Sequence, residues 1–297
     1  MERLDANATW THVQKMQEGF NYVYGVTPLS TFQEAAATVA VYLAVVFGLK
    51  AIRQDRKPMK LTGLFVAHNL FLSCASGVLL VALVSELFKQ WVEAGGGLGG
   101  VTEIWCDNEH RQHAFFNSRV VSLYYMNYLF KYYELLDTCL MVLRGKPTPF
   151  LHVYHHAATL MLCWSQLYSE SGCQWVPIVI NLLVHVVMYY YYAVTSMGYK
   201  VWWKRHLTTL QIVQFAIDVP SCVVAMMMRV NAERSETGLP AAFEWLPTTM
   251  KCRGQWHGAL FGTGILFSYL VLFVNFFIYN YIVKARGRAS APKKKVQ

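Results

Sequence analysis

Long apolar segments constrain this sequence more than any other feature, because they leave no room for a soluble domain. Seven such segments span residues 32–52, 61–88, 116–143, 150–168, 174–196, 207–230 and 258–283. A helix rises about 1.5 Å per residue, so each segment can cross a hydrocarbon core of about 30 Å. Polar residues interrupt the third, fourth and fifth segments, which hydropathy therefore supports least. The pattern predicts an all-α polytopic membrane protein with seven transmembrane helices.

Composition and charge agree with a membrane protein. Charged residues make up 14% of the chain, whereas a soluble domain carries about 25%. The formal net charge is +9, and the basic residues cluster in short loops beside the apolar segments. Such clusters face anionic lipid or phosphate-bearing ligands, so no nucleic-acid partner is expected. The first thirty residues lack the apolar core of a cleavable signal peptide.

The basic loops also predict the orientation. Seven crossings place four basic regions on one side: Lys50–Lys60, Arg144 with Lys146, Lys200–Arg205, and the residues from Lys284 onwards. The positive-inside rule makes that side cytosolic and the N-terminus lumenal. We therefore expect a lumenal segment at 1–31, a membrane domain at 32–283 and a cytosolic basic tail at 284–297.

Three further features bear on the compartment. Asn7 begins a glycosylation sequon on the predicted lumenal side. Cys106 and Cys252 fall in two predicted lumenal loops, where a disulfide could persist, and whether they pair is left open. The chain ends with Lys294 and Lys295 followed by two residues, the form of a dilysine retrieval signal. The other interpretation of this tail is a basic end beside anionic lipid. We expect an endoplasmic reticulum membrane protein.

Polar residues recur on one face of four apolar segments, although a charge at membrane depth costs about 2.5 kcal/mol or more. Their spacings of three and four residues are those of a helix face. They are Asn127, Lys131, Glu134, Asp137 and Thr138; His152, His155 and His156; Asn181, His185 and Tyr189; and Thr208, Gln211, Gln214 and Asp218. The helical rise brings all four sets to one level in the cytosolic half. The sequence therefore predicts a single site, which His68 and Asn69 could also line. Lys131 with Glu134 could instead be a purely structural ion pair.

Three chemistries compete for these residues. Histidine clusters also hold two irons in membrane desaturases and hydroxylases, but those sites need about eight imidazoles. Five other histidines fall outside this level: His12, His110, His113, His206 and His257. Four histidines could hold one zinc ion, although nothing else in the sequence requires it. Acyl transfer uses histidine as nucleophile and base without a metal. A non-enzymatic seven-helix receptor or transporter stays open, although a transporter needs polar residues in both halves.

Four motifs resemble those of the ELO family of very-long-chain fatty acid elongases. They are the HxxHH sequence at residues 152–156, Lys131-x-x-Glu134-Leu135-x-Asp137-Thr138, Asn181-x-x-Val184-His185-x-x-Met188-Tyr189-x-Tyr191-Tyr192, and Thr208-x-x-Gln211-x-x-Gln214. HxxHH alone is moderately specific, whereas four motifs in this order are very specific. The resemblance covers about residues 61–283. Leu135 and Val184 are similar to the saturated and monounsaturated subgroup, and residues 201–204 to its fungal members.

The resemblance implies a seven-helix fold in which six helices surround a narrow acyl tunnel. It also implies the reaction, in which a long-chain acyl-CoA and malonyl-CoA give 3-oxoacyl-CoA, carbon dioxide and CoA. No cofactor or metal is expected. Expected partners are membrane lipid and the ketoacyl reductase, dehydratase and enoyl reductase of the elongation cycle, and a homodimer is compatible. The subgroup predicts a link to sphingolipid biosynthesis.

Within this framework we predict a role for each site residue. His155 attacks the thioester as the nucleophile, and His152 and His156 are the alternatives for this role. Asp137 or Glu134 orients a neighbouring imidazole, and Asn181, Gln211 or His185 donates to the enolate oxygen. The predicted substrate-binding residues are Lys131, Asn181, Tyr189, Gln211, Gln214, Lys204 and Arg205.

The acyl tail is expected to run from this site towards the lumen. Bulky residues near Val176, Ile180, Val224 and Met228 would then close the tunnel and set product length.

Overall fold

The computed structural model describes residues 20, 22–107 and 119–284. The described chain is helical, which confirms the all-α part of the predicted fold class. Its helices are α2 (Phe32–Arg53), α3 (Thr62–Glu93), α4 (Gly97–Cys106), α5 (Arg119–Leu143), α6 (Phe150–Tyr168), α7 (Trp175–Ser196), α8 (Lys204–Glu236) and α9 (Trp256–Phe277). A 3-10 turn, η2 (Gly172–Gln174), precedes α7, and a π-helical turn, η3 (Ile278–Val283), follows α9. The Asn7 sequon, the first residues of the third apolar segment and the dilysine tail lie outside the described residues.

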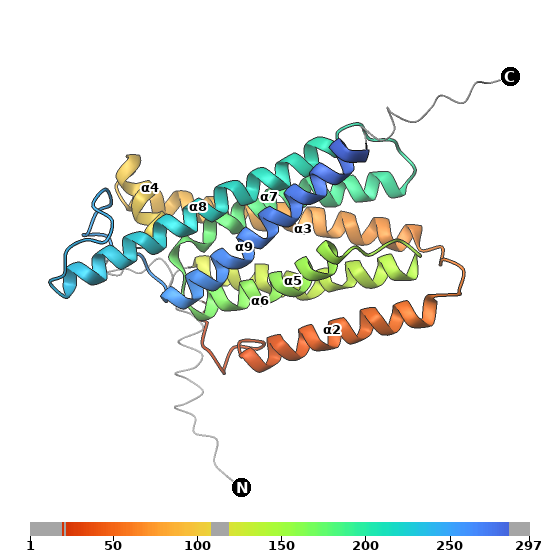
Figure 1. The fold of residues 1–297 in the computed structure, drawn as a ribbon, viewed down its shortest axis with the longest axis horizontal. Coiled ribbons are helices and arrows are strands. Elements are labelled where there is room, and N and C mark those ends of the chain that lie inside the picture. Colours follow the sequence, from red (N-terminus) through yellow and green to blue (C-terminus); the bar gives the residue numbers. More distant parts are fainter. Residues whose placement is uncertain (1–19, 21, 108–118, 285–297) are drawn as a thin grey trace, which may run out of the picture.

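The long helices lie side by side in one bundle, with α2 along its edge (Figure 1). Six of them pack in a closed order, in which α3 contacts α7, α7 contacts α8, and α8 contacts α9. The order continues from α9 to α6 and from α6 to α5, and α5 contacts α3 again. α2 packs outside this ring, against α5 and α6. The ring therefore has an interior that all six helices surround.

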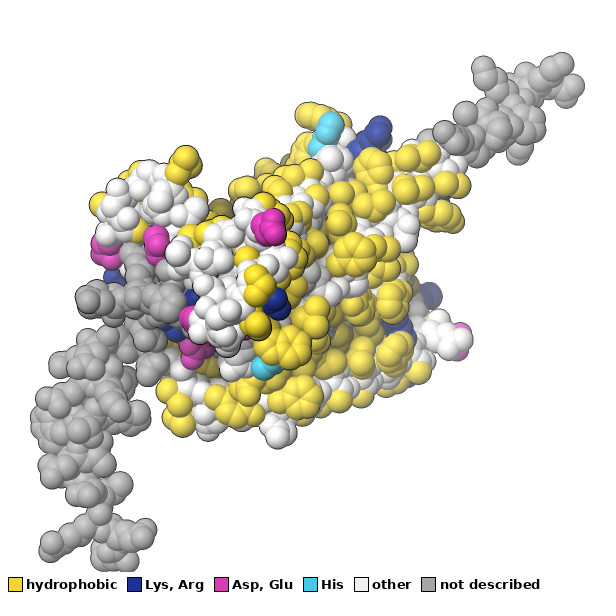
Figure 2. Space-filling model, turned by 60° about the vertical axis from the view of Figure 1, so that its left-hand side comes forward, with side chains coloured by type: hydrophobic (Ala, Val, Ile, Leu, Met, Phe, Trp, Pro, Cys, Tyr) yellow, Lys and Arg dark blue, Asp and Glu magenta, His cyan; other side chains and the backbone are white. Residues whose placement is uncertain are grey.

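The composition of the helices identifies a multi-pass membrane protein. Five segments are long and apolar enough to cross a membrane: α2, α3, Gly172–Ser196, α8 and Trp256–Val283. α5 and α6 do not meet this criterion, since they carry most of the charged and imidazole side chains of the predicted site. Val78 and Val81 of α3 expose 72% and 69% of their surface, as suits side chains that face lipid. Hydrophobic side chains cover most of the bundle face seen in Figure 2, and charged ones gather near its ends.

The helix ends follow local sequence signals. α2 begins at a capping box, in which Thr31 Oγ1 accepts from Glu34 N (3.3 Å) and Glu34 Oε2 accepts from Thr31 N (2.9 Å). α5 ends before Gly145, whose φ of 64° suits a residue without a Cβ. Met59 N donates to Leu143 O (3.0 Å), so the α2–α3 and α5–α6 loops meet. Basic loops from both hairpins thereby share one end of the bundle.

Two glycines let α9 pack closely against α6. A Cβ on Gly262 would lie 2.7 Å from Gln166 Nε2, and one on Gly258 would overlap the Ser169 side chain. Small residues four positions apart allow such close approach between membrane helices. Gln166 Nε2 donates to Gly258 O (2.9 Å) across the same interface. The contact closes the wall of the ring at the end opposite the basic loops.

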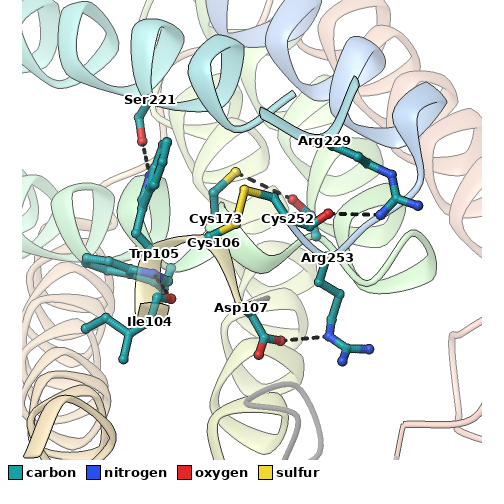
Figure 3. Close-up of a disulfide and its surroundings, with 11 residues drawn as sticks. Ile104, Trp105, Cys106, Asp107, Cys173, Ser221, Arg229, Cys252 and Arg253 are labelled. Atoms are coloured by element: carbon teal, nitrogen blue, oxygen red, sulfur yellow. Dashed lines mark hydrogen bonds and ion pairs between the residues drawn. A yellow bond between two sulfur atoms is a disulfide. The ribbon is translucent and has the colours of Figure 1, made fainter. Parts of the chain in front are cut away.

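A polar cap covers that opposite end (Figure 3). A disulfide joins Cys106, at the end of α4, to Cys252, in the loop before α9. The adjoining ion pair has Arg253 Nε 2.8 Å from Asp107 Oδ2. Arg229 Nη1 of α8 donates to Cys252 O (2.9 Å). The cap thus ties α4, α8 and the α8–α9 loop together.

Candidate active site

A buried ion pair on α5 is the first part of the site. Lys131 Nζ donates to Glu134 Oε1 (2.9 Å) and to Asn181 Oδ1 of α7 (3.2 Å). Asn181 Nδ2 donates to His185 Nε2 (3.2 Å), and His185 Nδ1 lies 3.3 Å from Glu134 Oε1. The four side chains therefore form a closed ring of polar contacts between α5 and α7. Buried charges persist only with such partners.

Asp137 forms the second part, one helical turn further along α5. Its Oδ1 accepts a hydrogen bond from His68 Nε2 of α3, and its Oδ2 accepts one from Tyr189 OH of α7 (2.8 Å). His156 Nε2 of α6 lies 3.8 Å from the same Oδ2. The carboxylate thus joins side chains from three other helices.

The histidines of α6 have different environments. The rings of His152 and His156 are 4.5 Å apart, and His155 lies 5.8 Å from His156. The ring of His155 packs against Tyr269 of α9 at 4.8 Å. His155 Nδ1 and His152 Nε2 are buried and accept no hydrogen bond from the described residues. His155 therefore has a ring nitrogen left over for another group.

Two cavities meet at His155. The polar cavity, with about 1050 Å³ of empty volume, is bounded by α5–α9 and includes Glu134, Asp137, His152, His156, His185, Tyr189, Lys204 and Gln211. The apolar cavity, with about 790 Å³, continues towards the disulfide cap and includes Leu162, Leu167, Pro177, Ile178, Cys222 and Leu266. Both are lined by His155, Asn181, Gln214 and Phe215. The shared lining places the two cavities next to each other inside the helix ring.

The basic end supplies the mouth of the polar cavity. Lys204, the first residue of α8, is exposed and lines this cavity. Arg205 is exposed as well, but it lines neither cavity; its guanidinium lies 5.4 Å from the centre of the Phe277 ring. Gln211 Nε2 contacts Met188 Sδ at 3.5 Å. Of the two predicted cationic ligands, Lys204 is the one that faces the cavity.

The lining of the apolar cavity lies near the four residues named from the sequence but does not include them. Val176, Ile180, Val224 and Met228 are absent from its lining, which instead includes their neighbours Pro177, Ile178 and Cys222. Met228 packs with Cys106, Cys173 and Cys252 in a separate cluster beside the cap. On α7 the lining residues are one or two positions from the expected ones, and on α8 the lining ends at Cys222, because the sequence does not fix how far each helix is rotated about its axis.

Sequence reasoning missed some of the site. Tyr269 packs on His155, and its hydroxyl donates to His155 O (3.2 Å). The residues three and four positions from Tyr269 on α9 are all apolar, so no polar pattern marks it. His68, which the sequence left undecided, contacts Asp137 directly but lines neither of these two cavities. Within the described chain, no group of three His, Cys, Asp or Glu side chains is arranged to hold a metal.

The ring of helices, the two adjacent cavities and the imidazole cluster define a multi-pass membrane protein with a site suited to acyl transfer. A family model described as ELO: GNS1/SUR4 family matches residues 27–289. A candidate fatty acid elongase of Schizosaccharomyces pombe is 39% identical over 277 residues, 92% of this chain and 78% of that protein. Fatty acid elongase A of Dictyostelium discoideum is 35% identical over 93% of this chain and 91% of its own length. Long chain fatty acid elongase 1 of Caenorhabditis elegans is 32% identical over 86% of this chain and 81% of its own length.

These matches establish what the motifs suggested. The chain belongs to the ELO (GNS1/SUR4) family of fatty acid elongases.

Proposed function

We propose that this elongase condenses a long-chain acyl-CoA with malonyl-CoA, and that His155 carries the acyl group between the two halves of the reaction. The products are 3-oxoacyl-CoA, carbon dioxide and CoA, so the enzyme is a 3-oxoacyl-CoA synthase that begins each two-carbon cycle. One observation carries the assignment of His155. Its imidazole stands where the polar and apolar cavities meet, and its Nδ1 has no partner among the described residues.

In the first half-reaction, an unprotonated nitrogen of His155 attacks the thioester carbon. The C–N bond forms as the C–S bond breaks, and CoA leaves as a thiolate that takes up a proton. His156, with Asp137 Oδ2 at 3.8 Å, is the neighbouring imidazole that can exchange this proton. The acyl-imidazole then holds the chain in the apolar cavity while the polar cavity empties.

In the second half-reaction, malonyl-CoA occupies the polar cavity and loses carbon dioxide. The enolate carbon attacks the acyl carbon, the C–N bond breaks, and the departing imidazole takes up one proton from solvent, which restores neutral His155. Gln211 and Gln214 line this cavity with amide groups that can donate to the enolate oxygen. Asn181 is less available, since its amide already contacts Lys131 and His185. Gln214 also lines the apolar cavity, so it is the better placed of the two glutamines.

The shape of the two adjacent cavities supports this division of the substrate. An acyl tail gains about 0.8 kcal/mol per buried CH₂, which favours the apolar cavity. The phosphates of CoA favour the basic end, where Lys204 lines the mouth. Membership of the elongase family favours this reaction over a di-iron desaturase or hydroxylase and over a transporter.

The membrane arrangement is part of the same proposal. All seven long helices cross the membrane, and six of them, α3 and α5–α9, surround the acyl tunnel, with α2 outside. The basic end faces the cytosol, where both CoA substrates are made, and the disulfide cap faces the lumen. We place the enzyme in the endoplasmic reticulum, with the lumenal segment 1–31, the membrane domain 32–283 and the retrieval tail 284–297. The reductases and dehydratase of the cycle are its expected partners, and a homodimer is compatible with the outward-facing α2.

Purified protein and labelled malonyl-CoA test the function directly. In the absence of reductant, the wild-type protein should release labelled carbon dioxide and form 3-oxoacyl-CoA from a long-chain acyl-CoA. With unlabelled acyl-CoA alone, one equivalent of CoA should be released and the acyl group should stay on the protein. A protein that remains well folded in detergent but forms no 3-oxoacyl-CoA with any acyl-CoA would refute the proposal.

A further inference from the structure

His68 has the geometry of a residue that acts through Asp137. It lies on α3, outside all four sequence motifs of the site, and only 4% of its surface is exposed. Its Nε2 contacts Asp137 Oδ1, while its Nδ1 lies 3.2 Å from Tyr133 OH. The ring also stacks on Tyr133 at 5.1 Å. Both ring nitrogens are therefore engaged.

Simple chemistry fixes the direction of these hydrogen bonds. An ionised carboxylate can only accept, so His68 Nε2 must carry a proton and donate it to Asp137. In a neutral imidazole Nδ1 is then an acceptor, and the Tyr133 hydroxyl donates to it. The result is a directed chain from Tyr133 through His68 to Asp137.

This chain holds one side of the carboxylate while Tyr189 holds the other. Tyr189 OH donates to Oδ2 at 2.8 Å, and the same Oδ2 faces His156 at 3.8 Å. With both oxygens anchored, the carboxylate cannot rotate about its Cβ–Cγ bond. Its position relative to His156, and through His156 relative to His155, is then set by His68.

We propose that His68 is a positioning residue for condensation, which holds the Asp137 carboxylate in the orientation that the α6 imidazoles require. The inference rests on the proposed function. His68 lines neither cavity of the proposed active site; it lines a separate cavity between α3 and α5, with Phe71 and Tyr133. Its effect must pass through Asp137.

Stability alone does not explain a histidine at this position. A buried polar pair is often no more stabilising than an apolar pair of the same volume. α3 and α7 already pack along their length, and Ser73 Oγ donates to Val186 O (2.8 Å) between them. An aliphatic residue at position 68 could fill the same volume. The hydrogen bond to a catalytic-site carboxylate is what an aliphatic residue could not supply.

A double-mutant cycle in the full-length protein tests the proposal. The variants are His68→Leu, Asp137→Asn and their combination, measured for kcat and KM with labelled malonyl-CoA. Ser73→Ala, on the same helix but away from Asp137, is the matched control. His68→Leu should lower kcat by roughly tenfold to a hundredfold, with KM for both substrates nearly unchanged. In the Asp137→Asn background the same change should have little further effect, a coupling of roughly fivefold or more.

Two conservative variants test the same proposal if the His68→Leu protein does not fold. His68→Gln places an amide donor near the position of Nε2 and should restore most of kcat. Tyr133→Phe keeps the ring and removes only the hydroxyl, and it should lower kcat in the wild type but not beside Asp137→Asn. If the losses in kcat of the single variants simply multiply in the double variants, His68 does not act through Asp137. A rise in KM without a fall in kcat would also overturn the positioning role. Because the wild type is assayed alongside, its own inactivity would instead refute the proposed function.

Discussion

Lys131 and Glu134 form a buried ion pair one turn apart on α5, with Nζ 2.9 Å from Oε1 and side chains that are 2% and 5% exposed. Removing one member leaves the other charge buried without its partner, which costs about 3–5 kcal/mol. Lys131→Met should therefore lower the melting temperature and abolish condensation. Thermal unfolding in detergent and the malonyl-CoA assay measure the two effects.

The double variant Lys131→Met/Glu134→Leu separates structure from catalysis. It removes both charges, so most of the lost stability should return. Activity should not return, because Asn181 and His185 lose the partners that hold them between α5 and α7. Recovery of both stability and activity would show that the pair is only structural.

His155→Ala should abolish condensation while the protein stays folded in the membrane. The expected loss in kcat is at least about a thousandfold, since the residue that forms the covalent intermediate is removed. His257→Ala is the matched control, because His257 is exposed at the capped end of the bundle. CoA release from acyl-CoA alone should also disappear in the variant. Normal incorporation of labelled malonyl units would exclude His155 as the nucleophile.

Side chains at the far end of the apolar cavity should set product length. Ile178→Ala enlarges the cavity, so products should lengthen by about one two-carbon cycle, and Cys222→Leu should shorten them. Val179→Ala, on the same turn of α7 but outside the lining, should leave the product spectrum unchanged. Products are measured by gas chromatography after elongation in membranes that supply the reductases and dehydratase. If Lys204 variants alter product length and the Ile178 and Cys222 variants do not, the acyl tail points towards the basic end and the predicted orientation is wrong.

The disulfide between Cys106 and Cys252 closes a loop with a sequence separation of 146 residues. Cross-links over long loops stabilise by about 2–4 kcal/mol. Cys106→Ser should therefore lower the melting temperature by several degrees, whereas Cys74→Ser, an exposed free cysteine of α3, should not. Condensation well below the melting temperature should survive, because the cap is remote from His155. Equal melting temperatures with and without reductant would contradict this prediction.

Lys204 is predicted to contact the phosphates of CoA. Lys204→Ala should raise KM for both CoA substrates by roughly threefold to tenfold and leave kcat nearly unchanged, since an exposed charge contributes about 1 kcal/mol. The effect should shrink at high salt. Lys200→Ala, exposed in the same loop but outside the cavity lining, is the control. A fall in kcat without a change in KM would assign Lys204 a different role.

The depth of the site in the membrane was predictable from the sequence, because polar residues at helical spacing stand out within apolar segments. The full length of the helices was not predictable. α3 continues to Glu93 and α8 to Glu236, beyond the predicted ends at 88 and 230. Hydropathy registers only the part of a helix that lies in hydrocarbon, whereas these last turns are polar.

The order of helices around the ring was also beyond the sequence. The spacing of polar residues shows which face of each helix is polar, but it does not show which neighbouring helix that face contacts. Asp137 and His68 are 69 residues apart in the chain, and no pattern linked them. The same uncertainty in rotation explains why Ile178 and Cys222, and not Ile180 and Val224, line the apolar cavity.

The closed ring of helices and the capped end restrict the route by which an acyl chain can enter and leave the cavity. If the acyl chain lies in the apolar cavity, as proposed, a chain that cannot leave through the wall or the far end must enter methyl first and leave by the same mouth. The 3-oxo group formed near His155 is then out of reach of any second enzyme until the whole chain has been withdrawn. Each round of elongation would thus end in complete release, and the final length would depend on how readily a grown chain can re-enter.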